Sequence, residues 1–300
     1  TNLRNYLLHL RPGGDGMAQS TRDIKRRIKS ISSTMQITRA MELVSSAKLI
    51  KARERLIRTR PYYYTVLENM QQTFNIVKDY HPLLKDRKIK NSLYIVISDD
   101  RGLAGGYNNN VVKLVEEECK GREKDVSLIL VGTKAVEHFS RTDFKIKERF
   151  IGITEDPIYS DAESIGKLAF ELYDNFVVDE IKVAYTRFVN NISHEPEIRQ
   201  LLPFVNFWEV EDRKNKDIEF EPSPKEVLDY LIPKYVNSCI YGTLIEAACS
   251  EQASRRIAME VASKNARDMI EELKISYNRA RQGAITTELN EIVTSAEVLK

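Results

Sequence analysis

The sequence predicts a mixed fold, in which the N- and C-terminal helices form a long antiparallel coiled coil and the middle forms a small Rossmann-like α/β domain. Three observations carry this prediction. Residues 20–60 contain no Gly or Pro, the chain after Pro233 contains no further proline, and the middle alternates short β-rich runs with helical stretches. With 300 residues, 42% of them hydrophobic, the chain can build one modest core and long helices that bury only a stripe.

The first predicted helix begins near Ser20, which forms a potential capping box with Asp23. Its apolar residues recur at helical spacing in one stripe and in a neighbouring one: Ile24, Ile28, Ile31 and Met35, then Ile37, Met41 and Val44. Pro61 either ends this helix or kinks it. Up to that point the helix would be roughly 60 Å long.

The other end of the chain has the same character. One stripe runs at spacings of three and four through Ala258, Ala262, Ala266, Met269, Leu273, Tyr277, Ala280 and Ala284. An apolar face then continues from Ile285 to Leu299, so an uninterrupted helix would approach roughly 100 Å. A helix this long needs a partner of similar length to cover its stripe, and the N-terminal helix is the candidate that the chain offers.

The middle reads as a sheet with mainly parallel order, because strand and helix patterns alternate. The predicted strands are Leu93–Ser98, Val126–Gly132, Phe144–Ile153, Glu180–Val189 and Leu201–Phe207. A helix is expected near Asn110–Cys119, and Asp161 is expected to cap another that reaches Phe176.

These elements divide the chain into five predicted segments. They are an extension over 1–16, a coiled-coil helix with a following helical segment over 17–90, the α/β domain over 91–208, a linker over 209–226 and the second coiled-coil helix over 227–300. The extension precedes Met17 and is interpreted as an expression scar or upstream stretch first, and as a targeting remnant second.

The sharpest candidate for chemistry is the loop Ser98–Asn108, which follows a strand and precedes a helix, where nucleotide phosphates often bind. Its spacing is neither GxGxxG nor a P-loop, and its adjacent aspartates would repel phosphate, so a structural turn is the favoured alternative. The sequence predicts no catalytic residues, no cofactor and no metal site. Cys119, Cys239 and Cys249 match no metal-binding spacing, and no run approaches the roughly 18 apolar residues that span a bilayer.

The N-terminal helix is strongly basic although the whole chain has a net charge of only +2. Between Arg22 and Arg60 there are twelve Lys or Arg residues and three acidic ones. Three interpretations remain open at this point: a solvated face, a nucleic-acid-binding helix, or a surface that meets an acidic protein partner. The spread of the basic residues around the helix and the apolar stripe through the same segment argue against nucleic acid.

Several segments resemble the gamma subunits of F-type ATP synthases. At the N-terminal end these are Ile24–Ile28, Gln36–Met41 and Ser45–Leu49, and in the middle the loop Ser98–Asn108 resembles the family loop with one extra Asp. Near the C-terminus they are Ser254–Met259, Lys264–Ala266, Tyr277–Gln282 and Ile285–Val293. The resemblance covers residues 17–300 in order; Ser295 and Val298 depart from the usual pattern at the helix end.

The resemblance implies a non-catalytic rotor shaft that couples ion-driven rotation of a membrane ring to the conformational cycle of the beta catalytic sites. Its implied partners are the alpha and beta catalytic subunits, the epsilon subunit and the membrane c-ring, with no nucleic acid and no direct membrane insertion. The implied location is the cytoplasmic face of the cell membrane. Residues 190–235 contain no cysteine, which resembles bacterial members rather than the thiol-regulated chloroplast ones.

The resemblance also implies contact residues toward the beta subunits. They are Met41, Arg281, Gln282, Thr286 and Glu288. In the family pattern Met41 matches a methionine near the Arg-Gln pair, and the apolar end from Ile285 to Leu299 turns inside a hydrophobic sleeve. The basic N-terminal helix would then face an acidic loop of the beta subunits.

Overall fold

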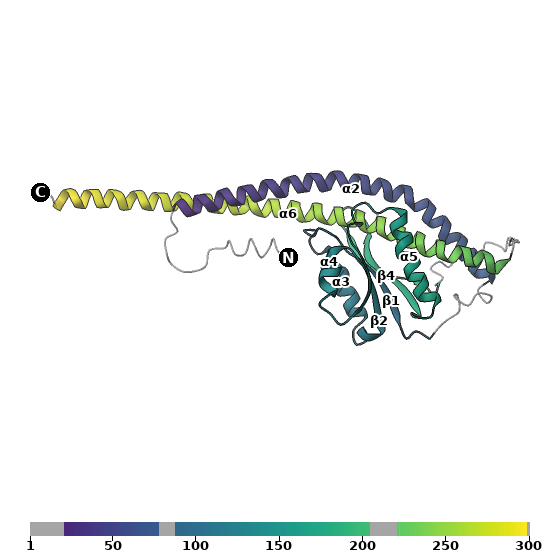
Figure 1. Ribbon diagram of the computed structural model, residues 1–300. Helices are drawn as coiled ribbons and strands as arrows, with labels where there is room; N and C mark the ends of the chain where they lie inside the picture. The colour runs from purple at the N-terminus through teal and green to yellow at the C-terminus, as the bar shows by residue number, and fades with distance from the viewer. Residues whose placement is uncertain (1–20, 78–87, 205–220, 222, 299–300) are drawn as a thin grey trace. The chain divides into compact units, whose positions relative to one another are not determined.

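Two very long helices dominate the secondary structure of the computed structural model, which describes residues 21–77, 88–204, 221 and 223–298. Helix α2 spans Thr21–Val77 and helix α6 spans Pro224–Val298 (Figure 1). Helix α2 continues through Pro61. Of the two alternatives for this proline, a helix that ends there is therefore excluded. The predicted extension over 1–16 and residues 209–220 of the predicted linker lie outside the described residues.

The chain forms two compact units that divide it inside both long helices. We call residues 1–45 with 255–300 the terminal unit, and residues 46–254 the sheet unit. In the terminal unit the hydroxyl oxygens of Thr38 and Ser263 lie 2.8 Å apart, and in the sheet unit the ring of Tyr63 packs against Gly242. Helices α2 and α6 are therefore antiparallel, as predicted.

The sheet unit contains one five-stranded sheet in the order β3-β2-β1-β4-β5. Its strands are β1 (Ser92–Ile97), β2 (Val126–Val131), β3 (Lys145–Phe150), β4 (Glu180–Phe188) and β5 (His194–Leu202). The first four are parallel, and β5 pairs antiparallel with β4 as an edge strand. The Rossmann-like prediction is confirmed, with this antiparallel edge added.

Helices cover both faces of the sheet. These are α3 (Tyr107–Glu118), α4 (Thr133–Phe139) and α5 (Tyr159–Asp174), with a 3-10 turn η2 at Glu123–Asp125. Tyr94 and Val96 of β1 point to the face that α3 and α4 cover. Leu93, Ile95 and Ile97 point to the other face, where α5 packs together with residues of α2 and α6. The two long helices thus complete the α/β core instead of merely flanking it.

Close backbone approach fixes α5 on α6. A Cβ atom on Gly166 of α5 would lie 2.0 Å from the Oδ1 atom of Asn237, so only glycine allows this spacing without displacing Asn237. Asp161 is the third residue of α5, and its carboxylate accepts the backbone N–H of Ile158 at 2.8 Å. This is the capping role that the sequence indicates for Asp161.

Candidate functional site

The seam of the terminal unit is narrow and combines a few large apolar side chains with small or polar ones. On α2 its buried positions recur every seven residues, at Ile24, Ile31, Thr38 and Ser45. On α6 the buried positions are Arg255, Met259, Ala262, Ser263 and Ala266. A seven-residue repeat is the seam of a coiled coil, and the small residues let the helix axes approach closely.

The second apolar stripe of α2 does not belong to this seam. Ile37 and Val44 are 62% and 53% exposed, and Met41 between them is half-buried. These residues share one helical face because they are spaced by four and three positions. The sequence places them beside the seam, whereas the structure turns them outward and makes them a potential contact surface.

The end of α6 is exposed on every side. Described residues of α2 begin at Thr21, which the Thr38–Ser263 contact places opposite residue 280 of α6. From Arg281 onward no described residue of α2 accompanies α6, and Ile285, Leu289 and Ile292 are 49–60% exposed. Arg281, Gln282, Thr286 and Glu288 are all exposed here, as a contact role requires.

The predicted contact residues do not form one cluster. Met41 and Arg281 are separated by about 21 residues along the antiparallel pair, measured through the Thr38–Ser263 contact, which corresponds to about 30 Å. The expectation that Met41 lies near the Arg-Gln pair is therefore wrong within this chain. Spacing along a sequence does not reveal the register between two distant helices, and the structure supplies it.

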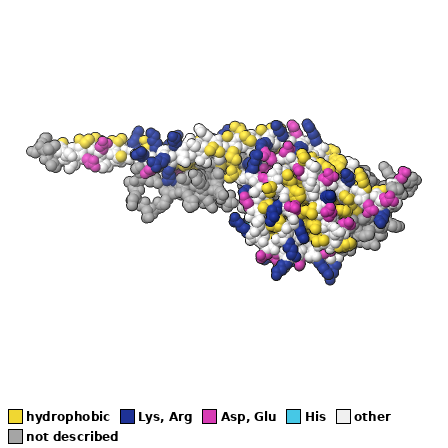
Figure 2. Space-filling model, viewed as in Figure 1, with side chains coloured by type: hydrophobic (Ala, Val, Ile, Leu, Met, Phe, Trp, Pro, Cys, Tyr) yellow, Lys and Arg dark blue, Asp and Glu magenta, His cyan; other side chains and the backbone are white. Residues whose placement is uncertain are grey.

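Exposed basic residues gather at the N-terminal end of α2 and on the part of α6 that lies beside it. Figure 2 shows dark-blue side chains concentrated there, whereas the end of α6 shows apolar side chains among uncharged polar ones, with a few acidic side chains. We call this group the basic collar: Arg22, Lys25, Arg26 and Lys29 of α2, and Lys274, Arg279 and Arg281 of α6, all exposed. Such a surface suits an acidic partner.

The loop Ser98–Asn108 of the sheet unit is a structural turn. Asp99 accepts the backbone N–H groups of Arg101 and Gly102 at 2.8 and 2.6 Å. Gly102, Leu103 and Gly105 adopt positive φ angles of 83°, 59° and 61°. Two of the loop's amide groups are therefore already used by Asp99 and are not available to a phosphate.

The long helices also fill the crevice at which Rossmann-like sheets usually bind nucleotides. The hydroxyl of Tyr107, at the start of α3, donates to the backbone oxygen of Ala247 in α6 at 3.1 Å. Leu49 and Leu56 of α2 form a cluster with Ile245, and Phe188 at the end of β4 packs on it. This part of the fold serves to seat the helices.

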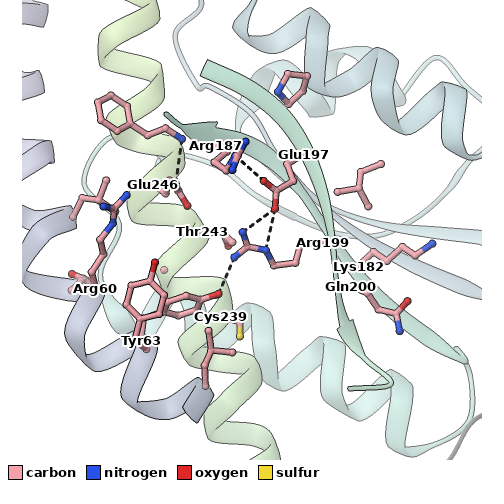
Figure 3. A pocket seen from close by; sticks show the side chains of 18 of the residues that line it. Arg60, Tyr63, Lys182, Arg187, Glu197, Arg199, Gln200, Cys239, Thr243 and Glu246 are labelled. Atoms are coloured by element: carbon pink, nitrogen blue, oxygen red, sulfur yellow. Dashed lines mark hydrogen bonds and ion pairs between the residues drawn. The ribbon is translucent and has the colours of Figure 1, made fainter. Parts of the chain in front are cut away.

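A cavity of about 1130 Å³ lies between α2, α6 and the edge strand β5 (Figure 3). Its charged side chains mostly pair with one another. Arg199 donates to Glu197 at 2.8 and 3.1 Å and to the hydroxyl of Tyr63 at 2.8 Å, and Arg187 lies 3.1 Å from Glu197. Burial raises the pKa of Glu246, and Arg199 opposes that rise. The arrangement resembles a structural ion-pair network and presents no nucleophile beside a general base.

The remaining reactive groups are inert. All three cysteines are buried and unpaired with one another, and burial raises the pKa of Cys119 to about 11 and of Cys239 and Cys249 to about 12. They stay protonated at neutral pH and are poor nucleophiles. Within the described ranges no cluster of three or more potential metal ligands occurs, and no described helix is apolar and long enough to cross a membrane.

Comparison with known proteins assigns the chain to a family of subunits. The family model described as ATP synthase matches residues 20–299. The chain is similar to the ATP synthase gamma chain of Alkaliphilus metalliredigens, with 48% identity over 95% of this chain and all of the relative. It is also similar to the sodium ion specific ATP synthase gamma chain of Acetobacterium woodii, with 42% identity over 94% of this chain and all of the relative.

Solved structures show the same fold. A chain from the central stalk and c-ring of the Tetrahymena thermophila mitochondrial ATP synthase superposes with a TM-score of 0.61 at 25% identity, covering 76% of this chain and 99% of that one. A chain of the Euglena gracilis mitochondrial ATP synthase gives a TM-score of 0.69 at 17% identity, covering 93% and 94%.

Proposed function

The chain belongs to the ATP synthase gamma chain family, and we propose from this premise that it forms the central rotor shaft of an F-type ATP synthase. It is a non-catalytic subunit of a membrane-associated complex. One observation supports this role most directly: the terminal unit turns large apolar and basic side chains outward along a helix pair whose own seam is narrow. Such a surface suits surrounding subunits.

Rotation of this surface would act on the catalytic beta subunits through differential contact. The terminal unit is asymmetric, because the stripe of Ile37 and Val44 and the basic collar consist of different chemical groups at different positions. Each beta subunit meets a different part of the shaft as the shaft turns. A partner changes a conformational equilibrium only by interacting differently with its states, and a changing surface supplies that difference.

The end of α6 suits a rotating bearing within a hydrophobic sleeve of the alpha and beta subunits. Its hydroxyl groups are satisfied within the helix: Thr286, Thr294 and Ser295 donate to backbone oxygens four residues earlier at 3.0, 2.8 and 2.7 Å. They therefore place little demand on directional bonds from the surroundings. Apolar contact is non-directional, so the exposed side chains can slide past the sleeve without breaking specific bonds.

The basic collar would meet an acidic loop of the beta subunits, where charge complementarity guides orientation. Among the predicted contacts, Arg281 belongs to the collar, Gln282 and Thr286 follow it, and Glu288 adds an acidic group on the apolar end. Met41 would touch a beta subunit through the outward stripe of α2, separately from Arg281.

The sheet unit would contact the epsilon subunit and the membrane c-ring, which places the chain at the cytoplasmic face of the cell membrane. The coupling ion would be a proton or sodium. The Acetobacterium woodii relative carries the description sodium ion specific, which supports including the sodium option in any test.

Co-purification tests the assignment. The tagged chain should recover alpha and beta subunits from its cells, and recovery of neither would contradict the rotor role. In the assembled complex Met41→Lys and Arg281→Leu should impair the coupling of ATP turnover to ion transport, while Met41→Leu serves as the matched control. Full coupling in both variants would exclude these two contacts without excluding the role.

A further inference from the structure

A short loop of the sheet unit joins the sheet to both long helices. We call residues 153–158, between β3 and α5, the fastening loop. Two cations of α2 reach it: Lys48 pairs with Glu155, and Arg55 pairs with Asp156. Lys48 and Arg55 are seven residues apart and so lie on one face of α2. These contacts join parts of the chain that are more than 100 residues apart in sequence.

The loop is held firmly on the sheet side. Thr154 donates its hydroxyl and its backbone N–H to Oδ2 of Asp100, which follows β1, at 2.8 and 3.3 Å. The other carboxylate oxygen of Asp100 accepts the hydroxyl and N–H of Thr133, both at 2.9 Å. Glu155 also lies 2.6 Å from the guanidinium of Arg101. The loop therefore extends the carboxyl end of the sheet rigidly toward the helices.

Helix α6 is included through Arg55. Besides Asp156, this guanidinium donates to the backbone oxygen of Pro157, and it lies 3.4 Å from the hydroxyl of Tyr241 in α6. The ring of Tyr241 packs edge-on against Tyr159, immediately after the loop, with centroids 5.5 Å apart. One loop thus has polar or aromatic contacts with the sheet, α2 and α6.

These contacts are poorly explained by stability alone. The side chains of Lys48, Glu155 and Arg55 are about one-third exposed, and Asp156 is mostly exposed. Ion pairs with this exposure contribute little to the free energy of folding. They are directional, however, and add fixed points of lateral contact between the loop and α2 to the close packing of the helices on the sheet.

We propose that the fastening loop transmits torque between the sheet and the two long helices, with Glu155 as its central positioning residue. The proposal rests on the rotor function, since only a rotor loads this junction sideways. Glu155 holds this place because it receives Lys48 from α2 and Arg101 from the loop after β1. Arg55 is the second positioning residue, through its contacts with the loop and α6.

The test uses the complete ATP synthase with the alpha and beta subunits immobilised. A rotation probe is attached through Lys147→Cys, an exposed position on β3. In the stalled complex the alpha and beta subunits hold the two long helices in place. The angular fluctuations of the probe then report the torsional stiffness of the connection between the sheet and these helices. Glu155→Gln should lower that stiffness, because it weakens the ion pairs of Glu155 with Lys48 and Arg101. ATP hydrolysis should stay unchanged, and ATP synthesis at a limiting ion gradient should fall.

Glu148→Gln is the matched control, because Glu148 is exposed on β3 and its carboxylate accepts the backbone N–H of its neighbour Arg149 at 2.9 Å. Lys48→Met should reproduce the loss, and it replaces Glu155→Gln if that variant does not assemble. The double variant should lose less stiffness than the sum of the losses in the two single variants, because both substitutions remove the same contact.

Three results would overturn the proposal: unchanged stiffness in the variants, an equal loss in the control, or strictly additive losses. Failure of the rotor function itself has a different signature. In that case the probe on the otherwise unchanged complex would not rotate with ATP at all.

Discussion

The two compact units solve the problem of burying apolar surface in opposite ways. The sheet unit encloses large side chains such as Tyr173, Tyr185 and Phe139 almost completely. The terminal unit buries a narrow seam, in which Ile24 and Ile31 stand beside small or polar residues, and leaves Ile275, like Ile37, more than 60% exposed. The sheet unit therefore derives its stability from its own interior, whereas the terminal unit is shaped for surfaces that other subunits supply.

The largest expected effect contrasts one glycine from each unit. Gly132 of the sheet unit has φ +95°, and a Cβ atom there would lie 2.5 Å from the backbone oxygen of Ser98. Gly132→Ala should lower the free energy of unfolding by about 3–5 kcal/mol, because both the backbone conformation and the space reject a side chain. Chemical denaturation followed by circular dichroism measures the change.

Gly283→Ala in the terminal unit is the counterpart. It lies within α6, and a Cβ atom there meets nothing within 4 Å. Alanine should stabilise the helix by about 0.5–1 kcal/mol, since glycine weakens a helix interior. Equal destabilisation by both substitutions would contradict the comparison of the two units.

A smaller effect tests the polar anchoring of the sheet unit. Asp100 accepts four hydrogen bonds from Thr133 and Thr154, and removal of its carboxylate should cost about 2–3 kcal/mol at neutral pH. Burial alone would raise the pKa of Asp100, but hydrogen bonds from Gly152, Thr154 and Thr133 lower it below the usual 3.8.

The folded state therefore binds fewer protons than the unfolded state near this pKa. The stabilisation by Asp100 is present above about pH 4 and is lost as the pH falls through the lowered folded value. Asp100→Ala should differ most from the unchanged chain at neutral pH and least in strong acid, as measured by denaturation at several pH values. A difference that does not vary with pH would show that the carboxylate charge is irrelevant.

The seam of the terminal unit predicts a still smaller effect. Thr38→Val leaves the buried hydroxyl of Ser263 without its 2.8 Å partner and should cost about 1–2 kcal/mol. Adding Ser263→Ala should recover most of that loss, because removal of both polar groups leaves none unsatisfied. Thermal unfolding of both variants checks this, and an additive loss would exclude the hydroxyl pair as the cause.

The contrast between the units also explains what the sequence can predict. Strands β1 and β2 lie inside the sheet and read as apolar runs, and the long helices follow from stretches that are poor in Gly and Pro. The edge strand β5 (HEPEIRQLL) has no such run, and the strand predicted over Leu201–Phe207 shares only Leu201 and Leu202 with it. Helix α4 has only seven residues, too few for a helical period to be recognised.

The candidate contact site, like the fold, could be predicted only in part from the sequence. Exposure of Arg281, Gln282, Thr286 and Glu288 agrees with their predicted contact role, which remains a prediction. The outward direction of Ile37 and Val44 was not predictable from the sequence. The spacing of apolar residues along a helix is the same whether they pack against another helix of this chain or against another subunit. A hint was present, since α2 carries two stripes and a helix pair needs one.

The smallest effect on folding therefore carries the most information about function. Ile37→Ala should change the free energy of unfolding of the isolated chain by no more than about 0.5 kcal/mol, because the side chain is already 62% exposed. In the assembled complex the same change should weaken coupling of ATP turnover to ion transport, since the apolar contact is made there. Ile31→Ala, six residues earlier and in the buried seam, should do the reverse and cost about 2–4 kcal/mol in the isolated chain. If Ile37→Ala destabilised the isolated chain as much as Ile31→Ala, the outward stripe would be part of the seam and could not be a surface for partners.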